Sequence, residues 1–217
     1  MRSVIKYILD PVIKKAFLWY HSKPRKYSYH GITVTVLPEV FPPHFTLSTK
    51  ILLNFINKLD LIGKTVLELG CGSGIISMFS ASKNAHVTAS DINKIALRNL
   101  KLESKKNNLP IQVIYSDLFD NINQSFFDYI IINPPYYPRS PKNTQEKAWF
   151  CGKDFEYFEK LFSQLVSRAD HKNAYLILSE DCDFKAINEI AEKNNLQLKC
   201  VLEKKVFFEK NYIYSIL

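Results

Sequence analysis

An acid and three glycines follow an apolar segment in the stretch TVLELGCGSGI, residues 65–75. Glu68 precedes Gly70, Gly72 and Gly74, and a helix-like segment comes directly after them. Glycines let the backbone turn tightly and let a ligand approach without a Cβ atom in the way. The spacing G-x-G-x-G differs from the G-x-G-x-x-G of dinucleotide-binding folds, and the loop contains no phosphate-binding lysine. The pattern predicts a ligand loop that does not serve nucleotide hydrolysis, although a structural turn would also explain three glycines alone.

Two more acids stand at the ends of the next two strand-like segments, HVTASD and IQVIYSD. Asp91 follows Gly70 by 21 residues, a distance at which an acid can accept hydrogen bonds from both hydroxyls of a ribose. Asp117 has the corresponding place one strand later and can accept from an adenine amino group. Asp91 or Asn93 could instead cap the helix that follows. Together with Glu68 and the glycine loop, these acids indicate a nucleoside ligand.

A fourth strand-like segment, FFDYIII, ends abruptly in Asn133-Pro134-Pro135-Tyr136. Proline cannot donate to a sheet ladder and is normally kept out of central strands. Glycine would close a loop, whereas proline has a fixed φ and no N–H. The alternative interpretation is a strand terminator without chemical function. We expect instead a rigid turn that presents its carbonyl and side-chain oxygens at the same edge of the sheet.

The elements that must position these residues alternate along the chain between strand-like and helix-like periodicity. Several of the strands are apolar throughout, as expected when both faces of a parallel sheet are covered. Two strands without a helix between them end the chain, in LQLKCVLEKKVFF and NYIYSIL, so one of them should pair antiparallel. The predicted fold is an α/β, doubly wound, seven-stranded and mostly parallel sheet with an antiparallel C-terminal strand. Strands are predicted over 65–70, 86–91, 111–117, 127–132 and 174–179, and helices over 75–83, 93–107, 154–169 and 183–194.

Residues 40–217 resemble the class I S-adenosylmethionine-dependent methyltransferases, a likeness carried by the glycine loop and the acids at consecutive strand ends. The resemblance implies S-adenosyl-L-methionine as the cofactor and implies no metal. Many members have Asp where Glu68 stands. The cofactor residues that the resemblance implies are Thr49, Glu68, Gly70, Cys71, Gly72 and Gly74 at the methionine end, Asp91 and Ile92 at the ribose, Asp117 and Leu118 at the adenine, and Asn133.

The INPPY segment resembles the [DNS]-P-P-[YFW] motif of methyltransferases that act on planar nitrogen. Such a nitrogen has its lone pair delocalised and is a poor nucleophile. Asn133 Oδ1 and the Pro134 carbonyl can each accept one N–H and hold the lone pair toward the methyl group. Tyr136 can stack on the planar group. The resemblance therefore implies Asn133, Pro134 and Tyr136 as catalytic residues.

The segment EKAWFCGKDFEYF is similar to a stretch of release-factor glutamine methyltransferases of the HemK type and their short eukaryotic relatives. Gly152 and Asp154 match that pattern, whereas Cys151 and Phe155 replace glycines. EVFPPHFTLSTKILL is similar to the segment that closes over the methionine end, with Pro43 and Thr49 as the best matches. A protein glutamine, such as one in a release factor, is slightly favoured over an RNA or DNA base amine. Another amine, or a module that binds the cofactor without turnover, remain alternatives.

Charge separates the first 30 residues from the rest. They contain seven Lys or Arg and one acid, a net charge of +6, out of +8 for the whole chain. Residues 4–17 have helical spacing of apolar residues with lysines between them, and a basic, aromatic linker follows. We therefore predict a basic amphipathic helix and linker over residues 1–30 and a methyltransferase domain over 31–217. The helix either packs on the domain, or contacts nucleic acid or an acidic partner, or lies on a membrane surface.

Composition excludes several classes of protein. The chain has 217 residues and is 47% hydrophobic, enough for one domain with a sizeable core. Its four cysteines are scattered, without a C-x-x-C pair, which argues against a disulfide scaffold or a metal site. No apolar run is long enough to span a bilayer, and the N-terminus lacks the pattern of a signal peptide. A cytoplasmic protein is the expectation.

Overall fold

The computed structural model describes residues 20–44, 46–206 and 209–217. The amphipathic helix predicted over residues 4–17 lies outside the described residues. Within the described part of the chain, no helix is both long and apolar enough to cross a membrane.

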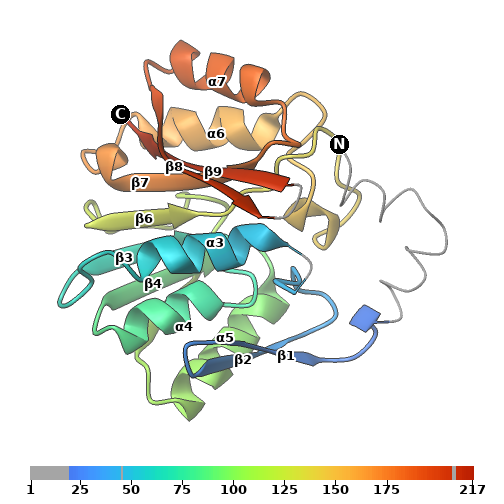
Figure 1. Cartoon of the computed structure of the whole chain (residues 1–217), viewed down its shortest axis with the longest axis vertical. Coiled ribbons are helices and arrows are strands. Elements are labelled where there is room, and N and C mark those ends of the chain that lie inside the picture. The colour runs from blue at the N-terminus through green and yellow to red at the C-terminus, as the bar shows by residue number, and fades with distance from the viewer. Residues whose placement is uncertain (1–19, 45, 207–208) are drawn as a thin grey trace.

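A seven-stranded sheet forms the centre of the molecule, in the order β5-β4-β3-β6-β7-β9-β8 (Figure 1). The pairs β3–β4, β3–β6, β4–β5 and β6–β7 are parallel, whereas β9 is antiparallel to both β7 and β8. The mostly parallel sheet with an antiparallel C-terminal strand is therefore confirmed. The strands are β3 (Thr65–Leu69), β4 (His86–Asp91), β5 (Ile111–Tyr115), β6 (Tyr129–Ile132), β7 (Ala174–Ser179), β8 (Leu198–Val206) and β9 (Glu209–Ile216).

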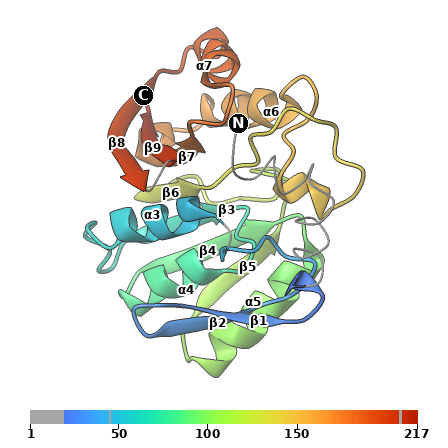
Figure 2. The ribbon, with the colours of Figure 1, turned by 45° about the vertical axis from the view of Figure 1, so that its right-hand side comes forward.

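Helices cover both faces of the sheet, as the continuous apolar strands require. Side chains of α3, α4 and α5 join one buried cluster and those of α6 and α7 join a second. Successive residues of β3 point to opposite faces, since Val66 belongs to the first cluster and Leu67 to the second. Figure 2 shows α6 and α7 together on one side, away from α4 and the β1–β2 hairpin. The helices are α3 (Leu47–Ile56), α4 (Ile75–Ser82), α5 (Lys94–Lys106), α6 (Glu156–Leu165) and α7 (Phe184–Lys193).

The predicted linker is wrong for residues 25–29. They form strand β1 (Arg25–Tyr29), which pairs antiparallel with β2 (Ile32–Val36). His30 and Gly31 both have positive φ, 45° and 85°, as a two-residue hairpin turn of type I′ requires. The Tyr29 ring packs edge-on against Phe79 of α4, with 4.9 Å between centroids. The division of the chain at residue 30 remains a prediction, and it falls inside this turn.

Candidate active site

A cavity of about 400 Å³ lies at the carboxyl ends of β3, β4, β5 and β6. Ligands of open α/β sheets bind at this edge, and the volume lies within the range of small-molecule sites. The structure thus brings together residues that are far apart in the sequence. The predicted residues that line the cavity are Thr49, Glu68, Gly70, Cys71, Gly72, Asp91, Ile92, Asp117, Leu118, Asn133, Pro134 and Tyr136.

Gly74 is the one predicted site residue that does not line the cavity. It precedes α4 with φ 74°, and a Cβ atom there would lie 2.5 Å from Leu100 Cδ1 of α5. Any other residue would be strained at this positive φ, and its Cβ atom would force Leu100 to move. Gly70 has φ 72°, is exposed, and would have no atom within 4 Å of an added Cβ. A Cβ atom at Gly70 would thus project into open space, and it is the positive φ that favours glycine there.

Glu68 is buried beneath the glycine loop, with 5% of its surface exposed. Its Oε2 accepts a hydrogen bond from the Ser77 backbone N–H at 2.8 Å and another from the Ser77 hydroxyl. The pKa of Glu68 is raised to about 8, mainly by burial and to a smaller extent by the nearby Asp91 carboxylate, while the Ser77 hydrogen bonds oppose the shift. At neutral pH the carboxyl is therefore mostly uncharged, and a cationic ligand in the cavity would favour its ionised form.

Replacing Glu68 by Gln should remove a pH dependence of folding stability. The pKa of Glu68 is about 8 in the folded protein against an ordinary 4.5, so folding favours the protonated carboxyl. This contribution is fully present below the unfolded pKa and is lost as pH rises through about 8. Between about pH 5 and 8.5, the free energy of unfolding of the wild type should fall by at least about 1 kcal/mol relative to Glu68→Gln. Urea denaturation of both proteins measures the difference, and parallel pH profiles would contradict the prediction.

Asp91 joins the end of β4 to the glycine loop. Its Oδ2 accepts from the Gly72 N–H at 2.8 Å and its Oδ1 from the Asn93 N–H at 2.7 Å. Burial raises the pKa of Asp91, while these backbone donors oppose the shift. Asn93 is the residue that caps α5, since its side chain accepts from the N–H groups of Ile95 and Ala96. The capping alternative for Asp91 is thus excluded, and its carboxylate lies on the cavity wall.

Asp117 lies at the outer end of the cavity, with 56% of its side chain exposed. Its Oδ2 is 2.9 Å from Lys160 Nζ of α6. The next residue, Leu118, is buried and has φ 53°, a left-handed conformation that a leucine rarely adopts. Ser116 stabilises this turn by donating its hydroxyl proton to the Leu118 carbonyl at 2.7 Å.

The Asn133-Pro134-Pro135-Tyr136 turn follows β6 and leads into Tyr137. Tyr137 packs against EKAWFCGKDFEYF, the segment that is similar to a stretch of release-factor glutamine methyltransferases. The Tyr137 N–H donates to the Trp149 carbonyl at 3.2 Å, and the Cys151 N–H donates to the Tyr137 carbonyl at 3.0 Å. Asn133 Nδ2 lies 3.5 Å from Thr49 Oγ1 of α3. These contacts place Asn133 and Tyr136 on the cavity wall between α3 and residues 149–151.

Tyr136 is half-buried, and its ring centroid lies 4.7 Å from that of Tyr137. Burial raises the pKa of Tyr136 to about 12. The phenol therefore stays neutral at physiological pH. It can stack or donate a hydrogen bond, but it does not serve as a base.

Several residues that line the cavity were not predicted from the sequence, among them Phe41, Trp149, Tyr157 and Lys160. The rings of Phe41 and Trp149 lie 4.8 Å apart between centroids, so two distant loops meet beside the glycine loop. Phe41 lies in EVFPPHFTLSTKILL and Trp149 in EKAWFCGKDFEYF, the two segments that are similar to segments of known methyltransferases. Neither aromatic residue was among the matched positions. Pro43, a matched residue, is buried outside the cavity lining.

A family model described as the methyltransferase small domain matches residues 31–150, more than half of the chain. A Methanocaldococcus jannaschii protein, provisionally named a protein N5-glutamine methyltransferase, is 40% identical over 111 residues, 51% of this chain and 54% of that protein. The ribosomal RNA small subunit methyltransferase C of Buchnera aphidicola is 33% identical over 135 residues, 61% of this chain and 41% of that protein. The chain thus spans about half the length of the curated relatives it matches.

Solved structures share the fold at low sequence identity. The E. cuniculi Mtq2–Trm112 complex matches with a TM-score of 0.63 and 22% identity, over 82% of this chain and 98% of that chain. The T. thermophilus 16S rRNA N2 G1207 methyltransferase, in complex with AdoMet and guanosine, matches with 0.63 and 18%, over 88% and 50%. The fold and the family match support S-adenosylmethionine as the cofactor, and the chain belongs to the methyltransferase small domain family.

Proposed function

We propose that the protein is an S-adenosylmethionine-dependent N-methyltransferase that acts on a planar amide or amine nitrogen of a macromolecule. The side-chain amide of a protein glutamine is the first candidate substrate. The observation that carries the proposal is the place of Asn133 and Pro134 on the wall of the same cavity as Glu68, Asp91 and Asp117. A hydrogen-bond acceptor for a planar nitrogen thus shares one cavity with acceptors for a nucleoside.

The chain's own residues fit the proposed cofactor. Asp91 is suited to accept from the ribose hydroxyls, because backbone donors already fix both of its oxygens in place. Asp117 offers an exposed carboxylate for the adenine amino group. Glu68 adds a buried carboxyl whose ionised form a cation favours. Bound S-adenosylmethionine would supply an electrophilic methyl group on a positively charged sulfur.

The Asn133 turn would orient the acceptor nitrogen. Asn133 Oδ1 and the Pro134 carbonyl each accept one N–H, so the lone pair of the nitrogen points at the methyl group. Proline at 134 and 135 restricts the backbone, because φ is fixed by the ring. Catalysis is then mainly positioning, which can contribute about 7–11 kcal/mol. No separate base is required, since the proton can leave after transfer.

Similarity to a protein glutamine methyltransferase favours glutamine as the substrate. The M. jannaschii relative at 40% identity is provisionally named for this activity. The Mtq2–Trm112 complex is described as responsible for methylation of the eRF1 translation termination factor. Gly152 and Asp154, which match the glutamine-specific pattern, belong to the loop that leads from the Tyr137 contact into α6. A release factor is the protein substrate that these likenesses suggest.

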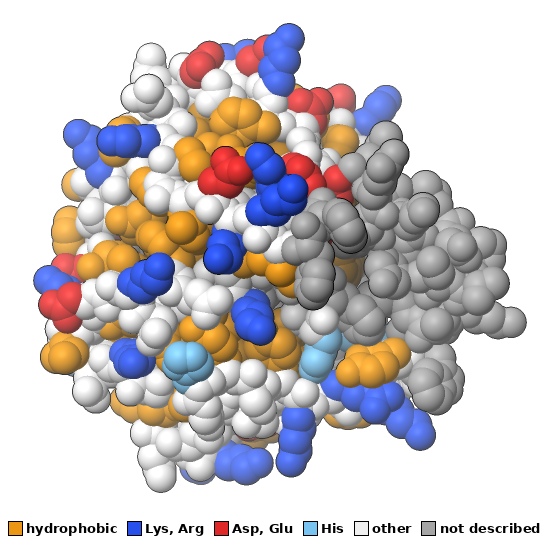
Figure 3. All heavy atoms as spheres, viewed as in Figure 1, with side chains coloured by type: hydrophobic (Ala, Val, Ile, Leu, Met, Phe, Trp, Pro, Cys, Tyr) orange, Lys and Arg blue, Asp and Glu red, His pale blue; other side chains and the backbone are white. Residues whose placement is uncertain are grey.

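An exocyclic amine of an RNA base is the second candidate. Several relatives at 33–38% identity are ribosomal RNA small subunit methyltransferases C. The chain has a net charge of +8. In the space-filling view, Lys and Arg side chains are spread over the face, whereas the acidic side chains gather mainly in its upper half (Figure 3). A positive net charge, of which residues 1–30 contribute +6, favours a polyanionic partner.

Methyl transfer from labelled cofactor tests both candidates in one experiment. The purified protein is incubated with total RNA, total protein and ribosomes from cells that lack it, and hydrolysates are separated. Label in methylglutamine supports the first candidate, and label in a methylated purine supports the second. No label in any fraction, with cofactor bound, would leave only a module that binds without turnover.

The salt dependence of substrate binding provides an independent prediction about residues 1–30. An RNA substrate that contacts this segment, which has a net charge of +6, should bind with a log–log salt slope of about −0.7 per phosphate contact. Replacing Lys14, Lys15, Lys23 and Lys26 by Gln should then flatten the slope without changing cofactor affinity. An unchanged slope would exclude the segment from RNA binding, and a fall in melting temperature alone would indicate a scaffold role.

A further inference from the structure

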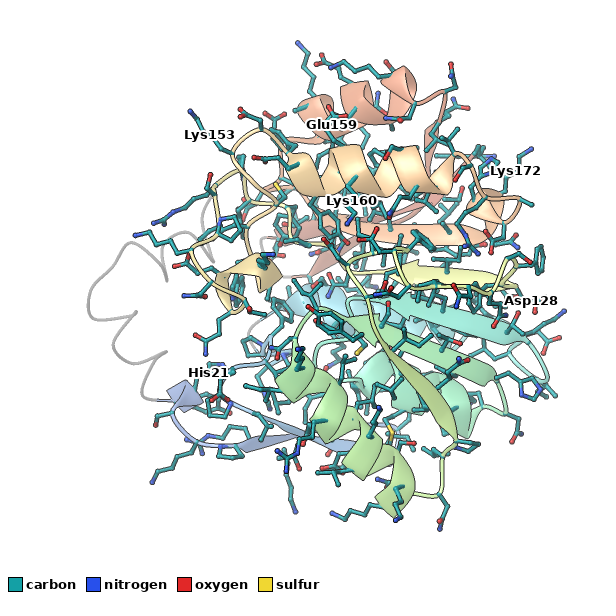
Figure 4. All side chains as sticks on the ribbon, turned by 180° about the vertical axis from the view of Figure 1, so that it is seen from behind. His21, Asp128, Lys153, Glu159, Lys160 and Lys172 are labelled. Carbon is teal, nitrogen blue, oxygen red and sulfur yellow. The ribbon has the colours of Figure 1, made fainter. Side chains whose placement is uncertain are left out.

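Lys160 of α6 holds two acids of the loop that follows β5. Its Nζ lies 2.9 Å from Asp117 Oδ2 and 2.7 Å from Asp120 Oδ2. Lys160 and Asp117 both line the cavity, at the end proposed for the adenine. Figure 4 shows Lys160 on the side of α6 that faces the strands, whereas Glu159 lies on the opposite side of the helix. The lysine therefore points toward the cavity from an element that no cofactor motif includes.

The loop does not depend on Lys160 for its attachment to α6. One turn further along the helix, Gln164 Nε2 donates to Asp120 Oδ1 at 2.7 Å, and Gln164 Oε1 accepts from the Phe119 N–H at 3.1 Å. Inside the loop, the Asn121 N–H donates to the Ser116 hydroxyl oxygen at 3.0 Å. These bonds would persist without the lysine, so its specific effect falls on the Asp117 side chain.

Asp117 needs an external partner to keep one orientation. More than half of its side chain is exposed, and an exposed carboxylate that lacks such a partner is free to change rotamer and to turn toward solvent. The lysine occupies Oδ2, which leaves Oδ1 as an acceptor for a group in the cavity. An exposed ion pair contributes little to folding, so stability alone does not account for a lysine shared between two acids.

We propose that Lys160 is a positioning residue that makes the site selective for a purine with a 6-amino group. By holding Asp117 Oδ2, it turns Oδ1 toward the purine edge, where that oxygen accepts from an amino group and repels a 6-oxo group. The inference rests on the proposed function, because it assumes that a nucleoside cofactor occupies this end of the cavity.

The test compares binding of S-adenosylhomocysteine with that of S-inosylhomocysteine, in which a carbonyl oxygen replaces the 6-amino group. Calorimetry on the full chain should show that the wild type prefers the adenosyl compound by at least about tenfold, the effect of an unmatched hydrogen bond to a charged group. In Lys160→Met this preference should fall about threefold to fivefold, in line with an exposed ion pair. Lys160→Arg should largely keep the preference, because arginine can also bridge two carboxylates.

Lys172→Met is the matched control, since it removes the same charge from the short 3-10 helix at the far end of α6 (Figure 4). It should leave the preference at the wild-type value. If Lys160→Met weakens the binding of both compounds equally, or leaves the preference unchanged, the proposed role of Lys160 is wrong. The proposed function would not be affected by this result. A wild type that binds neither compound would overturn the proposed function as well, so the two failures are distinguishable.

Discussion

Asn133→Ala is expected to slow methyl transfer by about a hundredfold or more, the usual cost of losing a positioned polar group in an active site. The change removes the side-chain oxygen that is proposed to accept one N–H of the substrate nitrogen. Cofactor affinity should stay near the wild-type value, because the acids at the other strand ends are untouched. Single-turnover transfer measures the first quantity and calorimetry with S-adenosylhomocysteine measures the second.

The fold should tolerate the Asn133 change. Among the described residues, the side chain makes one long hydrogen bond, 3.5 Å to Thr49 Oγ1, so little stability is lost with it. Asn173→Ala provides a matched control. Its Nδ2 donates to the Phe127 carbonyl at 2.8 Å, at the opposite end of β6 from the cavity, so transfer should remain normal. Near-normal turnover in Asn133→Ala would mean that the Asn133-Pro134-Pro135-Tyr136 segment only terminates β6 and has no catalytic role.

Asp91→Ala should weaken binding of S-adenosylmethionine at least about tenfold, because a buried acceptor for two hydroxyls is worth roughly 1–3 kcal/mol. Part of the loss has an indirect cause, since the same carboxylate fixes the Gly72 N–H of the glycine loop. Calorimetric titration of the cofactor measures the total effect. Wild-type affinity in the variant would refute the ribose assignment.

Asp128→Ala is the control for Asp91→Ala, and it separates an effect on cofactor binding from an effect on folding stability. Asp128 Oδ2 accepts from the Thr65 N–H and hydroxyl, each at 2.8 Å, and so ties β3 to the start of β6. It thus also makes a contact at a strand end, but at the start of β6, whereas the cavity lies beyond the carboxyl end of β6. The control should lower the melting temperature and leave cofactor affinity unchanged. Equal affinity losses in the two variants would indicate a general effect of destabilisation.

Local patterns predicted most strands of the sheet, because a continuous apolar run within one segment is enough to indicate a buried strand. His86–Asp91 and Ala174–Ser179 match their predicted bounds, and Thr65–Leu69 ends one residue early. The first strand of the hairpin at residues 25–36 was missed, because RKYSY is polar and aromatic and reads as a linker. Its register with Ile32–Val36 is stabilised by the His30–Gly31 turn and by packing on α4, which a scan for apolar runs does not detect.

The sequence by itself determined the residues at the strand ends, because parallel topology brings the carboxyl ends of β3, β4, β5 and β6 to one edge and each motif is contiguous. Only the tertiary structure decided which distant side chains complete that edge. Trp149 reaches Phe41, and Lys160 reaches Asp117. It also placed Gly74 beside Leu100 of α5, outside the residues that line the cavity. Such contacts depend on how helices α4, α5 and α6 dock on the sheet, and docking is set by the shapes of whole faces and not by any local run of residues.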